Sequence, residues 1–251
     1  MRLAAAVLLL LALPAGSADD RRSGFDFMSP STQAMQRDDS LNPAMLWVRD
    51  GERQWSAKAG HAERSCADCH GELARSMKGV AVRYPAFDPV AGQPLTLSAR
   101  INACRVRHQQ LAPLTPESEA LLGLESAVAM ASRGLPVSPP DDARLAPFRA
   151  EGRRLFQQRQ GQLDLSCAMC HDRHAGGRLG GSVIPQGHAT AYPLYRLEWQ
   201  ALGSLQRRLR NCLNGVRAEL PPFGAPELVA LELYLAQRAA GLRLESPGVR
   251  P

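Results

Sequence analysis

Two Cys-x-x-Cys-His sequences constrain this chain more than any other feature. The first consists of Cys66, Cys69 and His70, and the second consists of Cys167, Cys170 and His171. In such a motif the two thiols add to the vinyl groups of a haem as thioethers, and the adjacent histidine becomes the proximal ligand of the iron. The sequence therefore predicts two covalently attached haem c groups, one at each motif.

Zinc and disulfides are the alternatives for these cysteines. The chain has six cysteines, which would suggest disulfides in an exported protein. Two Cys-x-x-Cys pairs also occur in structural zinc sites. Neither alternative requires a histidine directly after each pair, so the motif favours haem.

The first residues are typical of a secretory signal peptide. Arg2 supplies a positive charge, residues 3–13 are all apolar, and small residues lead to a cleavage site near Ala18. The apolar run falls short of the roughly 20 residues that span a bilayer. We expect residues 1–18 to be removed, and the mature chain to be exported without a membrane span.

The formal net charge of +6 raises the question of nucleic acid binding. No basic run interleaved with aromatic residues is present, and an exported protein seldom meets nucleic acid. We therefore expect no nucleic acid partner.

An internal duplication surrounds the two motifs. The first motif is preceded by Trp47, Gly51, Trp55, Gly60 and Ser65, and at one constant offset the second is preceded by Phe148, Gly152, Phe156, Gly161 and Ser166. Further on, the apolar stripe of Leu121, Leu124 and Val128 corresponds to that of Leu228, Leu231 and Leu235, and Glu125 corresponds to Glu232. This helical spacing predicts core-facing helices. The fold class is therefore mainly α, with two tandem class I cytochrome c-like domains, irregular loops and an N-terminal extension.

The duplication also suggests domain boundaries. We expect an N-terminal domain over residues 19–135, a proline-rich linker over 136–147 and a C-terminal domain over 148–251. Residues 19–44 lack clear periodicity and are predicted to wrap the first domain as an irregular extension. Pro116 and Pro226 suit a first helical turn, and Gly134 and Gly241 suit a position after a last turn.

The second axial ligand of each haem needs its own argument. Methionine is a frequent partner in small cytochromes, but none occurs after Met169, which lies inside the second motif. The candidates in the second half are His174, His188 and Cys212. His174 follows the proximal histidine too closely to reach the other face of a haem.

One further cysteine occupies a matching place in each half. Cys104 follows Arg100 by four residues, as Cys212 follows Arg208. Equivalent roles as thiolate ligands are favoured, because a nearby arginine lowers the pKa of a thiol. A Cys104–Cys212 disulfide, buried free thiols, and ligation by His108 or His188 remain the alternatives.

At these residues the chain resembles the SoxA family, the dihaem subunits of the SoxAX cytochromes of bacterial sulfur oxidation. The similar stretches extend over nearly the whole mature chain and include residues 22–28, 83–87, 101–105, 186–188, 192–199, 208–212, 216–219 and 231–236. The resemblance implies axial pairs of His70 with Cys104 and of His171 with Cys212. It also implies a periplasmic heterodimer with SoxX, a small monohaem cytochrome.

The resemblance further implies an activity. Thiosulfate would be coupled oxidatively to a cysteine of the SoxYZ carrier protein, with two electrons passing through haem to a downstream cytochrome c. Cys212 would be the catalytic residue, modified to a persulfide, and Arg208 would bind the substrate. Arg210 and Arg217 would either add positive field or be surface charges. A thiosulfate dehydrogenase that makes tetrathionate and a plain electron shuttle are the competing functions.

Overall fold

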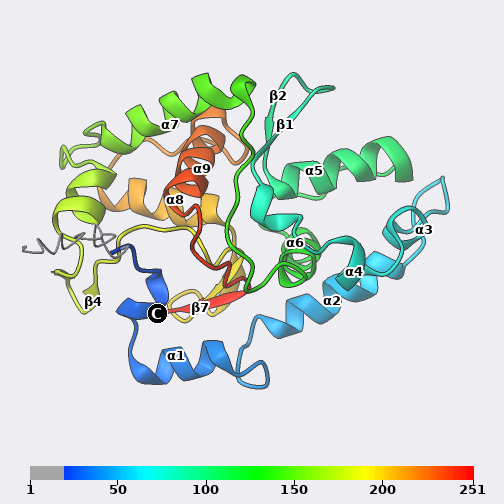
Figure 1. The fold of residues 1–251 in the computed structure, drawn as a ribbon, viewed down its shortest axis with the longest axis horizontal. Coiled ribbons are helices and arrows are strands. Elements are labelled where there is room, and N and C mark those ends of the chain that lie inside the picture. Colours follow the sequence, from blue (N-terminus) through cyan, green and yellow to red (C-terminus); the bar gives the residue numbers. More distant parts are fainter. Residues whose placement is uncertain (1–19) are drawn as a thin grey trace, which may run out of the picture.

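In each half of the chain two helices cross closely, as the computed structural model of residues 20–251 shows (Figure 1). In the first half these are α2 (Met45–Ser56) and α6 (Glu119–Met130), and in the second half they are α7 (Ala146–Gln157) and α9 (Pro226–Arg238). The signal peptide expected at residues 1–18 lies outside the described residues. No helix among residues 20–251 is long and apolar enough to cross a membrane.

Equivalent glycines make both crossings possible. A Cβ atom on Gly51 would lie 2.0 Å from the carbonyl oxygen of Gly123, and one on Gly152 would lie 2.0 Å from that of Ala230. The predicted apolar stripes face the core, because all six of their residues are buried: Leu121, Leu124, Val128, Leu228, Leu231 and Leu235. The mainly helical duplicated fold predicted from the sequence is therefore confirmed.

The haem motifs lie on short helical segments that begin at equivalent serines. The first occupies α3 (Cys66–His70), followed by α4 (Leu73–Ser76), and the second runs into the π-helical turn η5 (Met169–Arg173). The Ser65 hydroxyl accepts a hydrogen bond from the backbone N–H of Asp68 at 3.0 Å, and the Ser166 hydroxyl accepts one from that of Met169 at 3.2 Å. These caps fix where each motif starts.

A hairpin followed by a helix is a further repeated unit, which was not predicted from the sequence. The first copy consists of β1 (Ala86–Asp88), β2 (Gln93–Leu95), α5 (Leu97–Cys104) and the π-helical turn η3 (Arg105–Gln109). The second consists of β5 (Leu194–Arg196), β6 (Ala201–Gly203) and α8 (Leu205–Gly215). Thr96 and Ser204 cap the two helices in the same way. This unit places Cys104 and Cys212 at equivalent positions.

The C-terminal strand extends the second hairpin into a three-stranded sheet. β7 (Gly248–Arg250) pairs parallel with β5, and β5 pairs antiparallel with β6, so the strand order is β6-β5-β7. A small hairpin of β3 (Arg178–Leu179) and β4 (Ser182–Val183) follows the second motif. The remaining short elements are the 3-10 turns η1 (Gly24–Phe27), η2 (Ala81–Arg83) and η4 (Ala143–Leu145).

The N-terminal extension differs from its prediction in structure and in location. It contains η1 and α1 (Pro30–Arg37), and α1 packs beside β7 of the second half (Figure 1). The Gln36 side chain accepts a hydrogen bond from the Val249 N–H at 2.9 Å, and that of Asn42 donates one to the Pro247 carbonyl at 3.0 Å. The expectation of an irregular segment on the first domain is therefore only partly correct, because the segment contains helices and packs on the second half, while Asp39 also pairs with Arg133 of the first half at 2.7 Å. Its polar residues pair with backbone far away in sequence, which local periodicity does not reveal.

The two halves are joined by hydrogen bonds between the segments that follow α6 and α9. Gly134 N–H donates to the Leu244 carbonyl, and Val137 N–H donates to that of Leu242, both at 2.8 Å. Gly134 and Gly241 have φ of +83° and +86°, so both glycines do follow helix ends. Pro116 does not start a helix, because Ser118 caps α6 instead; Pro226 occupies the first turn of α9 as expected.

Candidate active site

His171 of the second motif is held in one orientation by the loop that follows β4. Its Nδ1 lies 2.7 Å from the Pro185 carbonyl oxygen, which only accepts, so the ring donates from Nδ1. Nε2 is then left as the metal-binding atom. Gly187 packs against the imidazole ring, since a Cβ atom at this position would lie 3.0 Å from His171 Cγ. This arrangement suits a proximal haem ligand.

Cys212 of α8 faces His171. Burial raises the pKa of its thiol, but a hydrogen bond with His171 and the positive charges of Arg208 and Arg196 outweigh that effect, so the pKa lies below its ordinary value. A lowered thiol pKa favours the thiolate, which is the form that ligates metals and acts as a nucleophile. The structure thus brings together the two residues that were predicted to be axial ligands of the second haem.

Arg208 and its counterpart Arg100 have different partners. The Arg100 guanidinium donates to the buried carboxylate of Asp88 at 2.7 Å, and Arg107 lies 3.4 Å from the same oxygen. Arg208 is part-buried one helical turn before Cys212, and no carboxylate within residues 20–251 forms an ion pair with it. Its positive charge is therefore available to an anion, although it also acts on Glu198 from a distance, whereas that of Arg100 is offset by an ion pair with a carboxylate that Arg107 shares.

Two residues near Cys212 were missed by the sequence reasoning. Tyr192 is close enough to Arg208 and Cys212 to feel both charges, and burial raises the pKa of its phenol, which therefore stays protonated. Arg196 pairs with Glu198 at 2.8 Å and stacks on Trp199. Both lie at or beside β5, and only its hairpin geometry brings them to α8.

The other arginines of this region are engaged elsewhere. Arg210 donates to the Pro221 carbonyl and lies 4.7 Å from the centre of the Phe223 ring. Arg207 stacks on Trp199 at 4.2 Å. Arg217 is exposed and occupies a left-handed backbone conformation with φ of +58°. Arg208, by contrast, acts on the Cys212 thiol through its charge and has no ion-pair partner within residues 20–251.

The first motif is built similarly but is more open. Burial raises the pKa of the Cys66 thiol, and Arg105 and Cys104 lie near that thiol. The Trp55 indole donates to the Gly71 carbonyl at 2.9 Å and lies 5.6 Å from the His70 ring. His70 and Cys69 are exposed. Cys104 thus approaches the first motif as Cys212 approaches the second.

The positions of the cysteines and histidines bear on the other roles considered for them, which were disulfides, zinc ligation and haem ligation by a second histidine. All six cysteines are free thiols, so the Cys104–Cys212 disulfide is wrong. The two Cys-x-x-Cys pairs lie in different halves, and within residues 20–251 no group of three or more His, Cys, Asp or Glu side chains is arranged to hold a metal ion. His108 and His174 are exposed, as expected for His174.

Comparison with known proteins agrees with this architecture. The family model described as SoxA/TsdA, cytochrome c domain, matches residues 50–137 and again residues 151–244. The SoxA subunit of L-cysteine S-thiosulfotransferase from Rhodovulum sulfidophilum is 37% identical over 92% of this chain and 81% of its own length. The corresponding subunit from Pseudaminobacter salicylatoxidans is 36% identical over 92% of this chain and 82% of its own length.

A solved structure gives the same result for the fold. The crystal structure of SoxXA from P. pantotrophus superimposes with a TM-score of 0.88 at 34% identity, covering 92% of this chain and 87% of that one. The chain is thus a protein with two cytochrome c domains. It belongs to the SoxA/TsdA family.

Cytochrome c domains imply haem c, and the second site fits that group. Cys167 and Cys170 are unpaired, His171 is fixed through Nδ1, and a thiol of lowered pKa faces it. Thiolate and imidazole are both known axial ligands of haem iron.

Proposed function

We propose that this chain is the dihaem subunit of an L-cysteine S-thiosulfotransferase that couples thiosulfate oxidatively to a cysteine of a SoxYZ-type carrier protein. It would act in the periplasm as a heterodimer with a SoxX-type monohaem cytochrome and would deliver two electrons to a downstream cytochrome c. The relatives named above carry this activity in their names, and the SoxXA structure supports the heterodimer.

The proposal includes a specific set of haem contacts. Cys66 and Cys69 bind one haem covalently in the domain of residues 19–135, and Cys167 and Cys170 bind the other in that of residues 148–251. The axial pairs are His70 with Cys104 and His171 with Cys212. The facing positions of His171 and Cys212 support the second pair, and the nearness of Cys104 to Cys66 supports the first.

The observation that carries the functional proposal is the unpaired positive charge beside a reactive thiol. Thiosulfate is a dianion, and an arginine can hold two of its oxygens in one plane. Arg208 is held one turn before Cys212 on α8, so it can place the terminal sulfur of thiosulfate next to the thiol. Arg196 adds positive field at the same thiol, and the protonated Tyr192 is an additional hydrogen-bond donor there.

The chemistry balances as a two-electron oxidation. The Cys212 thiolate and the terminal sulfur of thiosulfate form an S–S bond, which releases two electrons; haem held at the two motifs would supply the one-electron acceptors for them. The carrier thiolate then attacks the terminal sulfur, and the bond between that sulfur and Cys212 breaks. The carrier leaves with the thiosulfate group and Cys212 returns as a thiolate. If Cys212 carries a persulfide, the outer sulfur of that persulfide would take the place of the Cys212 thiolate in both steps.

A product analysis tests this function. The holoprotein, purified with its SoxX-type partner, is incubated with thiosulfate, an oxidised cytochrome c and the SoxYZ-type carrier. We expect the carrier to gain the mass of one thiosulfate group at a single cysteine while the cytochrome is reduced. Tetrathionate as the main product without carrier would favour a thiosulfate dehydrogenase, and cytochrome reduction that is independent of thiosulfate would favour an electron shuttle.

A further inference from the structure

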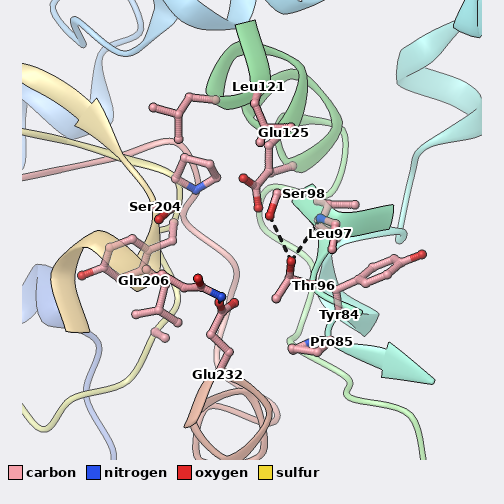
Figure 2. Close-up of a pocket in the computed structure, with 18 of the residues that line it drawn as sticks. Tyr84, Pro85, Thr96, Leu97, Ser98, Leu121, Glu125, Ser204, Gln206 and Glu232 are labelled. Atoms are coloured by element: carbon pink, nitrogen blue, oxygen red, sulfur yellow. Dashed lines mark hydrogen bonds between the residues drawn. The ribbon is translucent and has the colours of Figure 1, made fainter. Parts of the chain in front are cut away.

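A cavity lies between the two haem domains. Its volume is about 210 Å³, and its walls come from residues 81–137 of the first half and 189–244 of the second. Figure 2 shows Glu125 of α6 and Glu232 of α9 directed into it from opposite sides, with Gln206 of α8 beside Glu232. The two glutamates occupy equivalent positions of the duplicated modules, so the duplication itself placed two carboxyl groups in one interface.

The hydrogen bonds in the cavity leave one carboxyl oxygen without a partner. The Gln206 amide is fixed, because its oxygen accepts from the Gly224 N–H at 2.7 Å, and its nitrogen donates to Glu232 Oε1 at 2.7 Å. Glu125 Oε2 is buried, and no hydrogen-bond partner for it exists within residues 20–251. A buried ionised carboxylate without a donor is costly, whereas a protonated one is neutral.

The charges around the cavity are all of one sign. The ionisable residues in its walls are Glu117, Glu125, Glu232, Tyr84 and Tyr192, and no lysine, arginine or histidine is among them. Glu117 accepts a hydrogen bond from the Ser204 N–H at 3.4 Å and repels both other carboxylates. Like charges in a shielded space cannot all ionise at neutral pH.

We propose that this interdomain cavity is a proton-binding site, in which Glu125 and Glu232 both hold protons at pH 6 and thereby keep the two haem domains packed together. Water molecules are suitable partners for the protonated carboxyl groups, because the cavity has room for several at roughly 30 Å³ each. The carboxyl pair is distinct from the groups of the proposed activity, because neither Glu125 nor Glu232 belongs to a haem motif or to the proposed axial ligands, although Tyr192 lies in the wall of the cavity and also near Cys212.

The pH range of the effect follows from the pKa values. Burial, together with repulsion by Glu232 and Glu117, raises the pKa of Glu125 to about 8, and burial raises that of Glu232 to about 7. In the unfolded chain both return to an ordinary value near 4.5. Because the folded pKa is the higher one, the stability contributed by the protons is complete below about pH 4.5 and is lost as the pH rises through 7 and 8.

The interdomain hydrogen bonds report on this site. The amides of Gly134 and Val137 donate to the carbonyls of Leu244 and Leu242, and Val137 and Leu244 line the cavity as well. Ionisation of the carboxyl pair should therefore loosen these bonds first. Their hydrogen exchange is a direct measure of how tightly the domains are packed.

Infrared spectroscopy of the holoprotein between pH 5 and pH 9.5 tests the proposal. We expect a protonated-carboxyl C=O band at pH 6 that disappears with a midpoint between about 7 and 8. The band should lose part of its intensity in Glu125→Gln and in Glu232→Gln, and all of it in the double variant. Glu227→Gln is the matched control, because Glu227 is exposed on the same helix as Glu232, and it should leave the band unchanged.

Hydrogen exchange supplies a second readout on the same variants. After correction for base catalysis, protection of Gly134 and Val137 should fall roughly tenfold between pH 6 and pH 9 in the wild type, which corresponds to about one pKa unit of coupling. In the double variant it should not change with pH. Absence of the wild-type band at pH 6, as a cation bound between ionised carboxylates would cause, overturns the proposal. Equal loss of hydrogen-exchange protection between pH 6 and pH 9 in the wild type and in the double variant would also overturn the proposal.

Discussion

At the scale of single residues, the two haem modules differ most in the partners of one arginine. Arg100 forms an ion pair with the buried Asp88, while Arg208 has no ion-pair partner among residues 20–251. The sequence shows both arginines four residues before a cysteine and cannot distinguish them. Asp88 ends the first strand of the hairpin that precedes α5, and the fold turns it back onto Arg100, so the structure reveals why the local chemistry of the two modules is unequal.

Replacing each arginine should therefore have different effects on coupling. Arg208→Ala removes one charge-assisted contact with thiosulfate, worth about 1.5–3 kcal/mol, and should lower kcat/KM roughly 10- to 150-fold. Arg100→Ala should change it little, although it leaves Asp88 with Arg107 alone and should lower stability. The coupling rate against thiosulfate concentration is the measurement, with haem content as the control. Equal losses in the two variants would contradict the assignment.

Gly187 provides a second test at the residue scale, because it packs against His171. Its φ is +73°, and a Cβ atom would lie 3.0 Å from His171 Cγ. Gly187→Ala should displace the imidazole and change the spectrum of one haem only. Gly176→Ala is the control, since Gly176 has φ of +85° but no atom within 4 Å of a Cβ atom. Both variants should lose about 1–2 kcal/mol to backbone strain, so spectral changes of the same size in both would refute a positioning role.

At the scale of elements, the sequence predicted the crossing helices well because their periodicity and glycines are local and duplicated. The stripes of α6 and α9 and the glycines of α2 and α7 were all visible as repeats. The hairpins before α5 and α8 were not, because each strand has three residues and carries no alternating pattern. The capping residues Thr96 and Ser204 are the one local signal that could have revealed them.

The crossing of α7 and α9 can be tested at its closest point. Gly152→Ala places a methyl group against the Ala230 carbonyl oxygen, and such overpacking costs about 1–3 kcal/mol or more. We expect a lower denaturant midpoint for the holoprotein. Gly215→Ala on α8 is the control, because a Cβ atom there meets nothing within 4 Å, and it should be neutral or slightly stabilising. A neutral Gly152→Ala would show that the helices do not cross as described.

At the scale of the whole molecule, the sequence showed two modules but not how they fit together. The N-terminal extension packs on the C-terminal strand, with Gln36 receiving the Val249 N–H. The first residues of the expected linker pair with the segment after α9, where Val137 and Leu244 are buried. These contacts join segments far apart along the chain, and they consist of backbone hydrogen bonds and small buried side chains. Neither leaves a periodic pattern in a sequence.

At the same scale, the proposed function assigns different roles to the two similar modules, and this assignment rests on Cys212. The most direct test is the rate of thiosulfate coupling to the carrier by Cys212→Met and Cys104→Met holoproteins, each with its haem content and axial-ligand spectrum recorded. We expect both variants to retain two haems and each to change the signals of one haem. Coupling should fall to background in Cys212→Met and should largely persist in Cys104→Met. Coupling that survives in Cys212→Met, or that is lost equally in both, would contradict the placement of the active site in the second module.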